Sequence, residues 1–177
     1  EIDLNFTESP GESMLASLFL MLNKSNEVEN LIGSINPDFV YNLCGPSSPY
    51  ESIQNPKKNL QIETIFNNLT NGLIEYKNFC NFFQASSSEM FGKNPDSSRL
   101  NEDSLFYPNS PYSISKVANH SSVKKYRENY NWNIYSGIMF NHESEYRKEN
   151  YLIMKIIDSV KKIKGGEMKS LTLGSLD

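Results

Sequence analysis

Cysteine is scarce in this sequence: Cys44 and Cys80 are the only two, and they lie far apart along the chain. Zinc sites and thiol redox motifs need cysteines within a few residues of each other, so this spacing fits neither. A fold held together by disulfides would need a higher cysteine content. Both cysteines lie in apolar segments, where buried free thiols are expected. We therefore expect no metal site, and a reducing compartment, the cytoplasm.

An excess of charge of one sign and a long apolar run are also missing. The 17 basic and 21 acidic residues give a net charge of -4 and are mixed along the chain. This balance argues against a protein that binds nucleic acid through its phosphates. The longest apolar run, residues 14–22, is too short to span a bilayer. We expect neither a nucleic-acid partner nor a membrane partner.

The N-terminal stretch lacks the glycine spacing of a dinucleotide-binding turn. Such a turn usually shows three glycines, as GxGxxG or GxxGxxG, between a strand and a helix. Here residues 2–4 suit a strand and residues 12–24 an amphipathic helix, but Gly11 stands alone at the turn between them. We therefore expect residues 1–35 to be an atypical or truncated segment that precedes a core of residues 36–177.

From residue 36 onward, short apolar runs alternate with longer amphipathic stretches. The pattern predicts strands over residues 39–44, 81–84, 134–140 and 170–173, and helices over residues 59–76, 112–130 and 151–163. Strands and helices that alternate at this spacing form a parallel sheet with helices on both faces. We predict an α/β fold with a doubly wound, Rossmann-like parallel sheet.

One predicted helix carries a tyrosine and a lysine four residues apart, Tyr112 and Lys116. This spacing puts both side chains on one face, where the ammonium favours the phenolate and prepares it to act as a base. Tyr151 and Lys155 share the spacing, so the pair alone also fits a solvated surface pair. Context favours Tyr112, because polar residues 84–89 follow the preceding strand, and ligands bind beyond such strand ends.

Three segments then form a more specific pattern. They are residues 84–89 with Phe91-Gly92, residues 106–108 and 110–112 with Lys116, and residues 140–144, which read Phe-Asn-His-Glu-Ser. Together they resemble the GDP-mannose 4,6-dehydratase family of extended short-chain dehydrogenases/reductases, over about residues 36–177. The resemblance implies a lyase that converts GDP-mannose to GDP-4-keto-6-deoxymannose by internal hydride transfer through NADP.

The resemblance also implies roles for single residues. Tyr112, activated by Lys116, takes the proton of the sugar C4 hydroxyl, Glu89 removes the C5 proton, and Ser87 binds the C4 oxygen. The implied cofactor contacts are Leu43, Cys44, Gly45, Ser47, Lys116, His142 and Arg147. The implied substrate contacts are Ser87, Asn141 and Lys155. In this family the helices here at residues 59–76 and 112–130 pair between subunits, which implies a homodimer or homotetramer.

The chain departs from the family pattern at its cofactor-binding side. The glycine-rich loop is missing, residues 42–48 differ from the small-residue run of the family, and Lys58 replaces a cofactor-contacting tyrosine. Residues 173–177 end where the family continues into nucleotide-contacting residues, so we expect most of the C-terminal substrate region to be missing. Two alternatives stay open. One is another nucleotide-sugar epimerase or dehydratase, and the other is a catalytically dead, truncated paralogue that serves as an oligomerisation or binding module.

Overall fold

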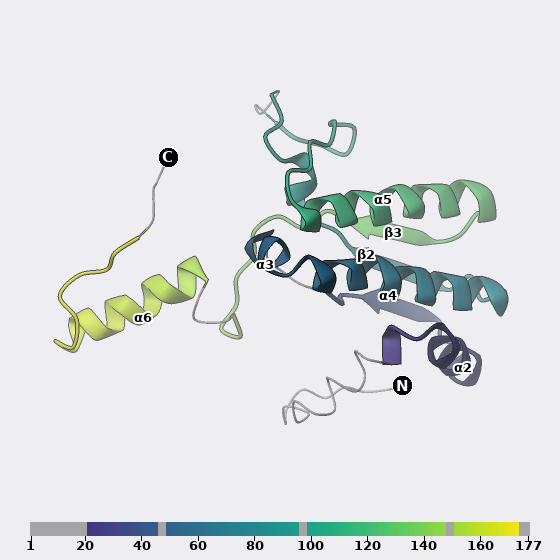
Figure 1. The fold of residues 1–177 in the computed structure, drawn as a ribbon, viewed down its shortest axis with the longest axis horizontal. Coiled ribbons are helices and arrows are strands. Elements are labelled where there is room, and N and C mark those ends of the chain that lie inside the picture. Colours follow the sequence, from purple (N-terminus) through teal and green to yellow (C-terminus); the bar gives the residue numbers. More distant parts are fainter. Residues whose placement is uncertain (1–20, 46–48, 96–98, 148–150, 174–177) are drawn as a thin grey trace. The chain divides into compact units, whose positions relative to one another are not determined.

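A computed structural model describes residues 21–45, 49–95, 99–147 and 151–173. The chain divides into two compact units, Glu1–Phe140 (unit 1) and Asn141–Asp177 (unit 2). Unit 1 contains, in chain order, α2 (Ser25–Ile35), β1 (Phe39–Asn42), α3 (Pro49–Gln54), α4 (Pro56–Glu75), β2 (Asn81–Ala85), the 3-10 helix η1 (Ser88–Phe91), α5 (Pro111–Tyr130) and β3 (Ile134–Gly137) (Figure 1). Unit 2 contains α6 (Leu152–Lys164).

The described strands of unit 1 form one parallel sheet in the order β1-β2-β3. Its register aligns Tyr41 with Phe83 and Tyr135, and one residue further along aligns Asn42 with Gln84. Parallel neighbours need a crossover between them, and α4 and α5 supply the two crossovers. The predicted parallel α/β sheet is therefore confirmed, and the carboxyl ends of its strands lie at one edge.

Helix α5 begins at a point that the local sequence fixes. Pro111 occupies its first turn, where a missing N–H costs no hydrogen bond. The Ser110 hydroxyl accepts a hydrogen bond from the Ser113 N–H at 3.1 Å, and the Ser113 hydroxyl accepts one from the Ser110 N–H at 3.0 Å. This reciprocal cap satisfies two helix-end donors. It also places Tyr112 and Lys116 in the first two turns of the helix.

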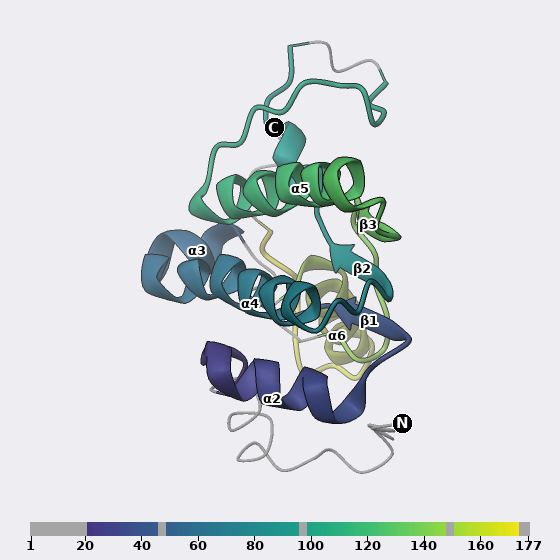
Figure 2. The same ribbon diagram turned by 90° about the vertical axis from the view of Figure 1, so that its right-hand side faces the viewer.

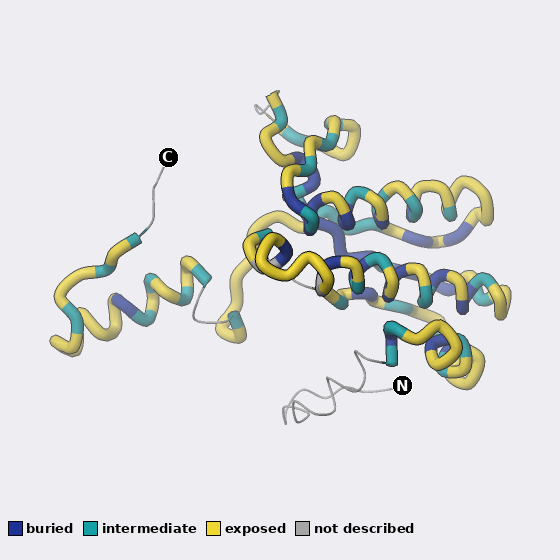
Figure 3. Tube along the Cα trace, in the orientation of Figure 1, coloured by how far each residue is buried: buried dark blue, intermediate teal, exposed yellow. Residues whose placement is uncertain are grey.

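The core of unit 1 lies between the sheet and helices α4 and α5, which sit on one side of the strands (Figures 2 and 3). Phe66 of α4 meets Phe82 of β2 edge to face, with ring centroids 6.1 Å apart, and Phe82 meets Trp132 at 5.9 Å. The Trp132 indole N–H donates to the Cys80 carbonyl at 2.6 Å, which satisfies the one polar atom of that ring. These contacts pack α4 against β2, and Tyr126 of α5 stacks on Phe66 with ring centroids 6.2 Å apart.

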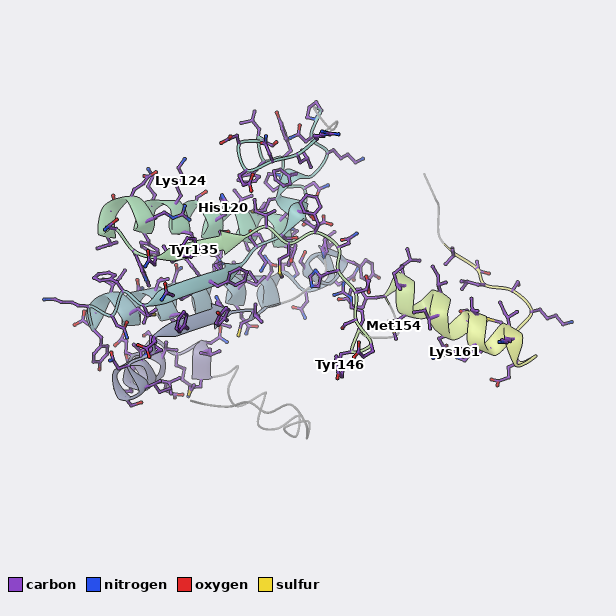
Figure 4. The ribbon with its side chains drawn as sticks, turned by 180° about the vertical axis from the view of Figure 1, so that it is seen from behind. His120, Lys124, Tyr135, Tyr146, Met154 and Lys161 are labelled. Atoms are coloured by element: carbon purple, nitrogen blue, oxygen red, sulfur yellow. The ribbon has the colours of Figure 1, made fainter. Side chains whose placement is uncertain are left out.

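The opposite face of the sheet carries exposed aromatic side chains. Tyr41 is 68% exposed and Tyr135 is 52% exposed. Figure 4 shows Tyr135 on β3. The next residue of that strand, Ser136, has its hydroxyl 2.9 Å from ring nitrogen Nδ1 of His120 on α5. In the described part of unit 1 the helices thus lie on one face, whereas the sequence pattern predicted helices on both.

Helix α2 and the C-terminal stretch differ from the sequence-based expectations. Helix α2 was not expected, yet Val28 and Ile32, four residues apart, are buried, and α2 contacts α4. Ser170–Leu173 was expected to be a strand, but these residues have no strand partner in the described part of unit 2. A lone extended segment has no ladder to join, so it stays irregular. The strand and most of the helix expected within residues 1–24 fall outside the described residues.

Helix α6 of unit 2 is amphipathic. Leu152, Ile153 and Val160 leave apolar surface exposed, and Ser159 is buried. Lys161, Lys162 and Lys164 stand in its last turn, where cations favour the negative end of the helix dipole. No helix within the described ranges is both long and apolar enough to cross a bilayer.

Candidate active site

Polar residues gather beyond the carboxyl ends of β1 and β2. After β2, the Ser86 N–H donates to the Gly137 carbonyl and the Ser88 N–H donates to the Met139 carbonyl, both at 2.9 Å. These bonds continue the pairing with the segment that follows β3. The serine run is therefore held as a rigid extension of the sheet edge.

Ser87 fixes the position of Glu89 through the start of η1. Ser87 is 8% exposed and its backbone is extended, so its hydroxyl caps η1 by accepting a hydrogen bond from the Glu89 N–H at 3.2 Å. Met90 and Phe91 are buried and anchor the far end of this turn. Glu89 itself is partly exposed. A carboxylate on a capped, anchored turn with access to solvent is suited to take a proton from a bound molecule.

Tyr112 and Lys116 are both buried at the start of α5, with exposed fractions of 7% and 5%. The Lys116 Nζ atom lies 5.5 Å from the centroid of the Tyr112 ring. The same ammonium donates a hydrogen bond of 2.8 Å to the carbonyl oxygen of Ala85, the last residue of β2. Helix α5 also contacts η1. The structure thus brings Tyr112 and Lys116 to the strand end that carries Ser87 and Glu89.

Burial lowers the pKa of Lys116 to about 8, and the nearby Cys44 opposes this effect. Burial also raises the pKa of the Cys44 thiol, and the Lys116 ammonium partly offsets that rise. At pH 7 most Lys116 side chains remain charged, because this pH is below their pKa. A charged Lys116 ammonium thus lies over the Tyr112 ring.

Two buried amides lie directly beneath this site. Asn42 and Gln84 are 2% and 0% exposed, and the Asn42 Nδ2 atom donates to the Gln84 Oε1 atom at 2.7 Å. Gln84 Nε2 donates in turn to the Ala85 carbonyl at 2.9 Å. Sequence reasoning placed Gln84 in the polar run 84–89 but gave neither amide a role of its own. The available signal was a polar residue near the end of each of two apolar strands.

The cofactor contacts predicted in unit 1 lie partly at this edge. Leu43 is 65% exposed, Cys44 is half-buried, and Gly45 has a φ of 128°, a conformation that favours glycine. Ser47 lies outside the described residues. Among the described residues, Lys116 Nζ donates one hydrogen bond, to Ala85. An ammonium has three donors, so two remain for hydroxyl groups such as those of a nicotinamide ribose. This donor set fits the nicotinamide ribose, which NADP shares with NAD.

The remaining predicted contacts belong to unit 2. Asn141, His142 and Lys155 are exposed, and Lys155 Nζ lies 3.4 Å from the Thr172 carbonyl. The Arg147 guanidinium stacks on the Tyr151 ring at 3.8 Å, and its Nε atom lies 3.6 Å from a Glu143 carboxylate oxygen. These contacts are internal to unit 2, so the predicted roles of the four residues stay predictions. Within the described residues, no group of His, Cys, Asp and Glu could hold a metal ion.

Comparison with known proteins assigns the chain to a family. The profile of the family described as GDP-mannose 4,6 dehydratase matches residues 12–177. The chain belongs to this family. It is 33% identical over 162 residues to GDP-mannose 4,6 dehydratase of Drosophila melanogaster, covering 88% of this chain and 40% of that protein. It is 32% identical over 183 aligned positions to the Vibrio cholerae O1 protein, covering 100% of this chain and 46% of that protein.

Solved structures agree on the fold. RMD from Pseudomonas aeruginosa, complexed with NADPH, superposes with a TM-score of 0.74 at 23% identity, over 83% of this chain and 50% of that one. A double mutant of the dTDP-glucose 4,6-dehydratase DesIV from Streptomyces venezuelae, with NAD and DAU bound, superposes with a TM-score of 0.68 at 18% identity, over 82% of this chain and 43% of that one. The chain spans less than half the length of the two relatives named above.

Proposed function

We propose that this chain carries the catalytic core of a nucleotide-sugar 4,6-dehydratase that converts GDP-mannose to GDP-4-keto-6-deoxymannose. One observation carries the proposal. Tyr112 and Lys116 are buried together against the end of β2, where Ser87 and Glu89 begin the next turn. This edge combines a base for an alcohol, a carboxylate for a carbon acid and a hydroxyl that can position the substrate oxygen.

Each residue would act on a different atom of the sugar. Tyr112, as phenolate beside the Lys116 ammonium, takes the proton of the C4 hydroxyl, and Ser87 holds that oxygen. The C4 ketone makes the C5 proton acidic, and Glu89 removes this proton and passes it to the C6 hydroxyl, which leaves as water. When hydride is back on C6, the proton held by Tyr112 returns to C5, so both residues end as they began. A bound NADP would supply the hydride chemistry that oxidises C4 and reduces C6. Lys116 would hold the cofactor ribose with its two remaining donors.

The direct test is to incubate the protein with GDP-mannose and NADP and to follow the 4-keto product by its absorbance in alkali. Tyr112→Phe removes the base and is expected to lower turnover by about 10²- to 10⁴-fold. Tyr130→Phe, at the exposed far end of α5, is the matched control and should keep wild-type turnover. Absence of both product and NADP binding would refute the proposal. Product from UDP- or dTDP-sugars, but not from GDP-mannose, would favour a different nucleotide-sugar enzyme.

The outer surface of the helices supports the alternative that the chain serves as an oligomerisation or binding module. Tyr50 and Ile53 of α3, Leu60 of α4 and Ile114 of α5 are between 55% and 72% exposed. Contacts between α3, α4 and α5 bring these elements together, and apolar side chains exposed this fully are typical of an interface. We propose that this surface pairs two copies as a homodimer, which in the family could extend to a homotetramer. Sedimentation should show a dimer. Ile114→Asp should dissociate this dimer, whereas the control Ile35→Asp on α2 should leave it intact.

We also propose a reducing compartment, the cytoplasm. Cys44 is half-buried and Cys80 is buried, and both are free thiols. Free cysteines persist where thiols are kept reduced. Quantitative alkylation of the protein isolated from its native cells should find two reactive thiols after denaturation, and a mixed disulfide at either position would contradict the proposal.

A further inference from the structure

The two buried amides beneath the site form part of a continuous chain of hydrogen bonds. The Cys44 N–H donates to Asn42 Oδ1 at 3.2 Å, Asn42 Nδ2 donates to Gln84 Oε1 at 2.7 Å, and Gln84 Nε2 donates to the Ala85 carbonyl at 2.9 Å. Lys116 Nζ donates to the same carbonyl at 2.8 Å. The chain therefore runs from the loop after β1 to the ammonium of the candidate active site.

The two ends of this chain fix the orientation of both amides. A backbone N–H can only donate and a backbone carbonyl can only accept. Asn42 must therefore turn its oxygen toward Cys44, which turns its nitrogen toward Gln84. Gln84 must then present its oxygen to Asn42 and its nitrogen to Ala85. The opposite orientation of either amide would leave two donors or two acceptors face to face.

The position of the pair within the sheet is also informative. Val40 and Phe82 are register partners one pleat earlier on the same face, and both are apolar. Asn42 and Gln84 are the next partners on that face, next to the predicted cofactor loop. The face thus changes from apolar to amide within one pleat. A buried amide is costly unless it is fully hydrogen-bonded, so its partners are held in fixed places.

We propose that Gln84, oriented by Asn42, is a positioning residue for Lys116. It holds the Ala85 carbonyl on which the ammonium rests, and through Asn42 it ties that carbonyl to the Cys44 N–H of the loop after β1. Gln84 acts through these groups and does not touch the substrate. The relay makes the location of the lysine depend on both strands rather than on α5 alone.

The first test measures Lys116 directly and needs no enzymatic activity. Competitive labelling of amines, read by mass spectrometry at increasing pH, gives the titration midpoint of Lys116, which is about 8 in the folded protein. In Gln84→Met the Ala85 carbonyl is no longer held in place for the ammonium. Weakening a hydrogen bond to the charged form at a buried site lowers the pKa, so the midpoint is expected to fall below that of the unmodified protein. Gln84→Asn keeps a buried amide, but the asparagine side chain is too short for the bond to Ala85, so the midpoint should shift in the same direction. This milder variant provides the measurement if Gln84→Met does not fold.

The matched control is Thr70→Val. Thr70 is fully buried, and within the described part of the chain its hydroxyl donates to the Phe66 and Asn67 carbonyls of α4. The variant therefore removes a buried polar group away from the relay. Its Lys116 midpoint should stay at about 8, the value of the unmodified protein. Fluorescence of Trp132, which is 1% exposed, reports whether each variant is folded. A folded Gln84→Met protein with an unchanged midpoint would overturn the proposal.

The second test is kinetic and rests on the proposed function. With GDP-mannose and NADP, Gln84→Met should lower kcat about tenfold, leave KM for GDP-mannose unchanged, and move the limb of the pH profile that reports the base. If the unmodified protein makes no product but the Lys116 midpoint moves in Gln84→Met, the proposed function fails and the positioning role stands. If the protein is active and the midpoint does not move, the positioning role fails alone.

Discussion

Replacing the buried lysine tests the electrostatics of the candidate site more sharply than any other change. Lys116 is 5% exposed, and burial lowers its pKa from 10.5 to about 8. A pKa change of one corresponds to about 1.4 kcal/mol, so holding the charge in the folded state costs about 3 kcal/mol below pH 8. Lys116→Met removes this cost but leaves the Ala85 carbonyl without its ammonium donor, a loss of about 1 kcal/mol. The variant should therefore be more stable by about 2 kcal/mol at pH 7.

The sign of this difference depends on pH. As the pH rises, the folded protein loses the Lys116 proton near pH 8, whereas the unfolded chain keeps it to about 10.5. The unfolded chain binds more protons in this window, so the wild-type protein gains stability as the pH rises. The advantage of Lys116→Met should shrink steadily above pH 8 and vanish by about pH 10.

The assay is urea unfolding at several pH values, followed by the fluorescence of the single tryptophan. Trp132 is 1% exposed in the core of unit 1, so its emission reports the unit that holds Lys116. Comparing the two proteins at each pH cancels the titration of other groups except Cys44, which interacts with the lysine. Repeating the pair in a Cys44→Ala background removes that coupling. A stability difference that stays constant with pH would refute the reasoning.

Three further outcomes follow from the local geometry. Ser110→Ala removes the hydroxyl that caps α5 and should lower the free energy of unfolding by about 1 kcal/mol, as urea unfolding can check. The control Ser122→Ala, a serine inside α5 whose hydroxyl donates to the Ala118 carbonyl of the same helix, should change it little. Gly92→Ala should lower the free energy of unfolding by more than about 2 kcal/mol, because φ is 51° and the added methyl would clash with the Tyr107 carbonyl. Gly166 also has a positive φ but lies in open space, so Gly166→Ala measures the backbone strain without the clash. Trp132→Phe should lower the free energy of unfolding by about 1–3 kcal/mol, because the indole hydrogen bond to the Cys80 carbonyl is lost and a cavity is left. Thermal unfolding monitored by circular dichroism measures this change, and an unchanged midpoint would contradict the contact.

The sequence by itself determined the order of the three strands and of helices α4 and α5, and it predicted the residues of the candidate site. Short apolar runs predicted β1, β2 and β3, and the apolar spacing of α4 and α5 predicted both helices to within a few residues. The cap at Ser110-Pro111 set the register that puts Tyr112 and Lys116 on one face. These features are local, and hydrophobic periodicity and capping depend on neighbours along the chain.

Only the tertiary structure decided which of the two tyrosine–lysine pairs with four-residue spacing is buried. Tyr112 and Lys116 pack against the end of β2, whereas Lys155, of the pair with Tyr151, is exposed. Their spacing is the same, and the difference arises from strand pairing and helix docking, which bring together residues more than thirty positions apart. The Asn42–Gln84 relay likewise needs two strands in register. Burial and hydrogen-bond partners are properties of these distant contacts, so the periodicity of a single segment could not reveal them.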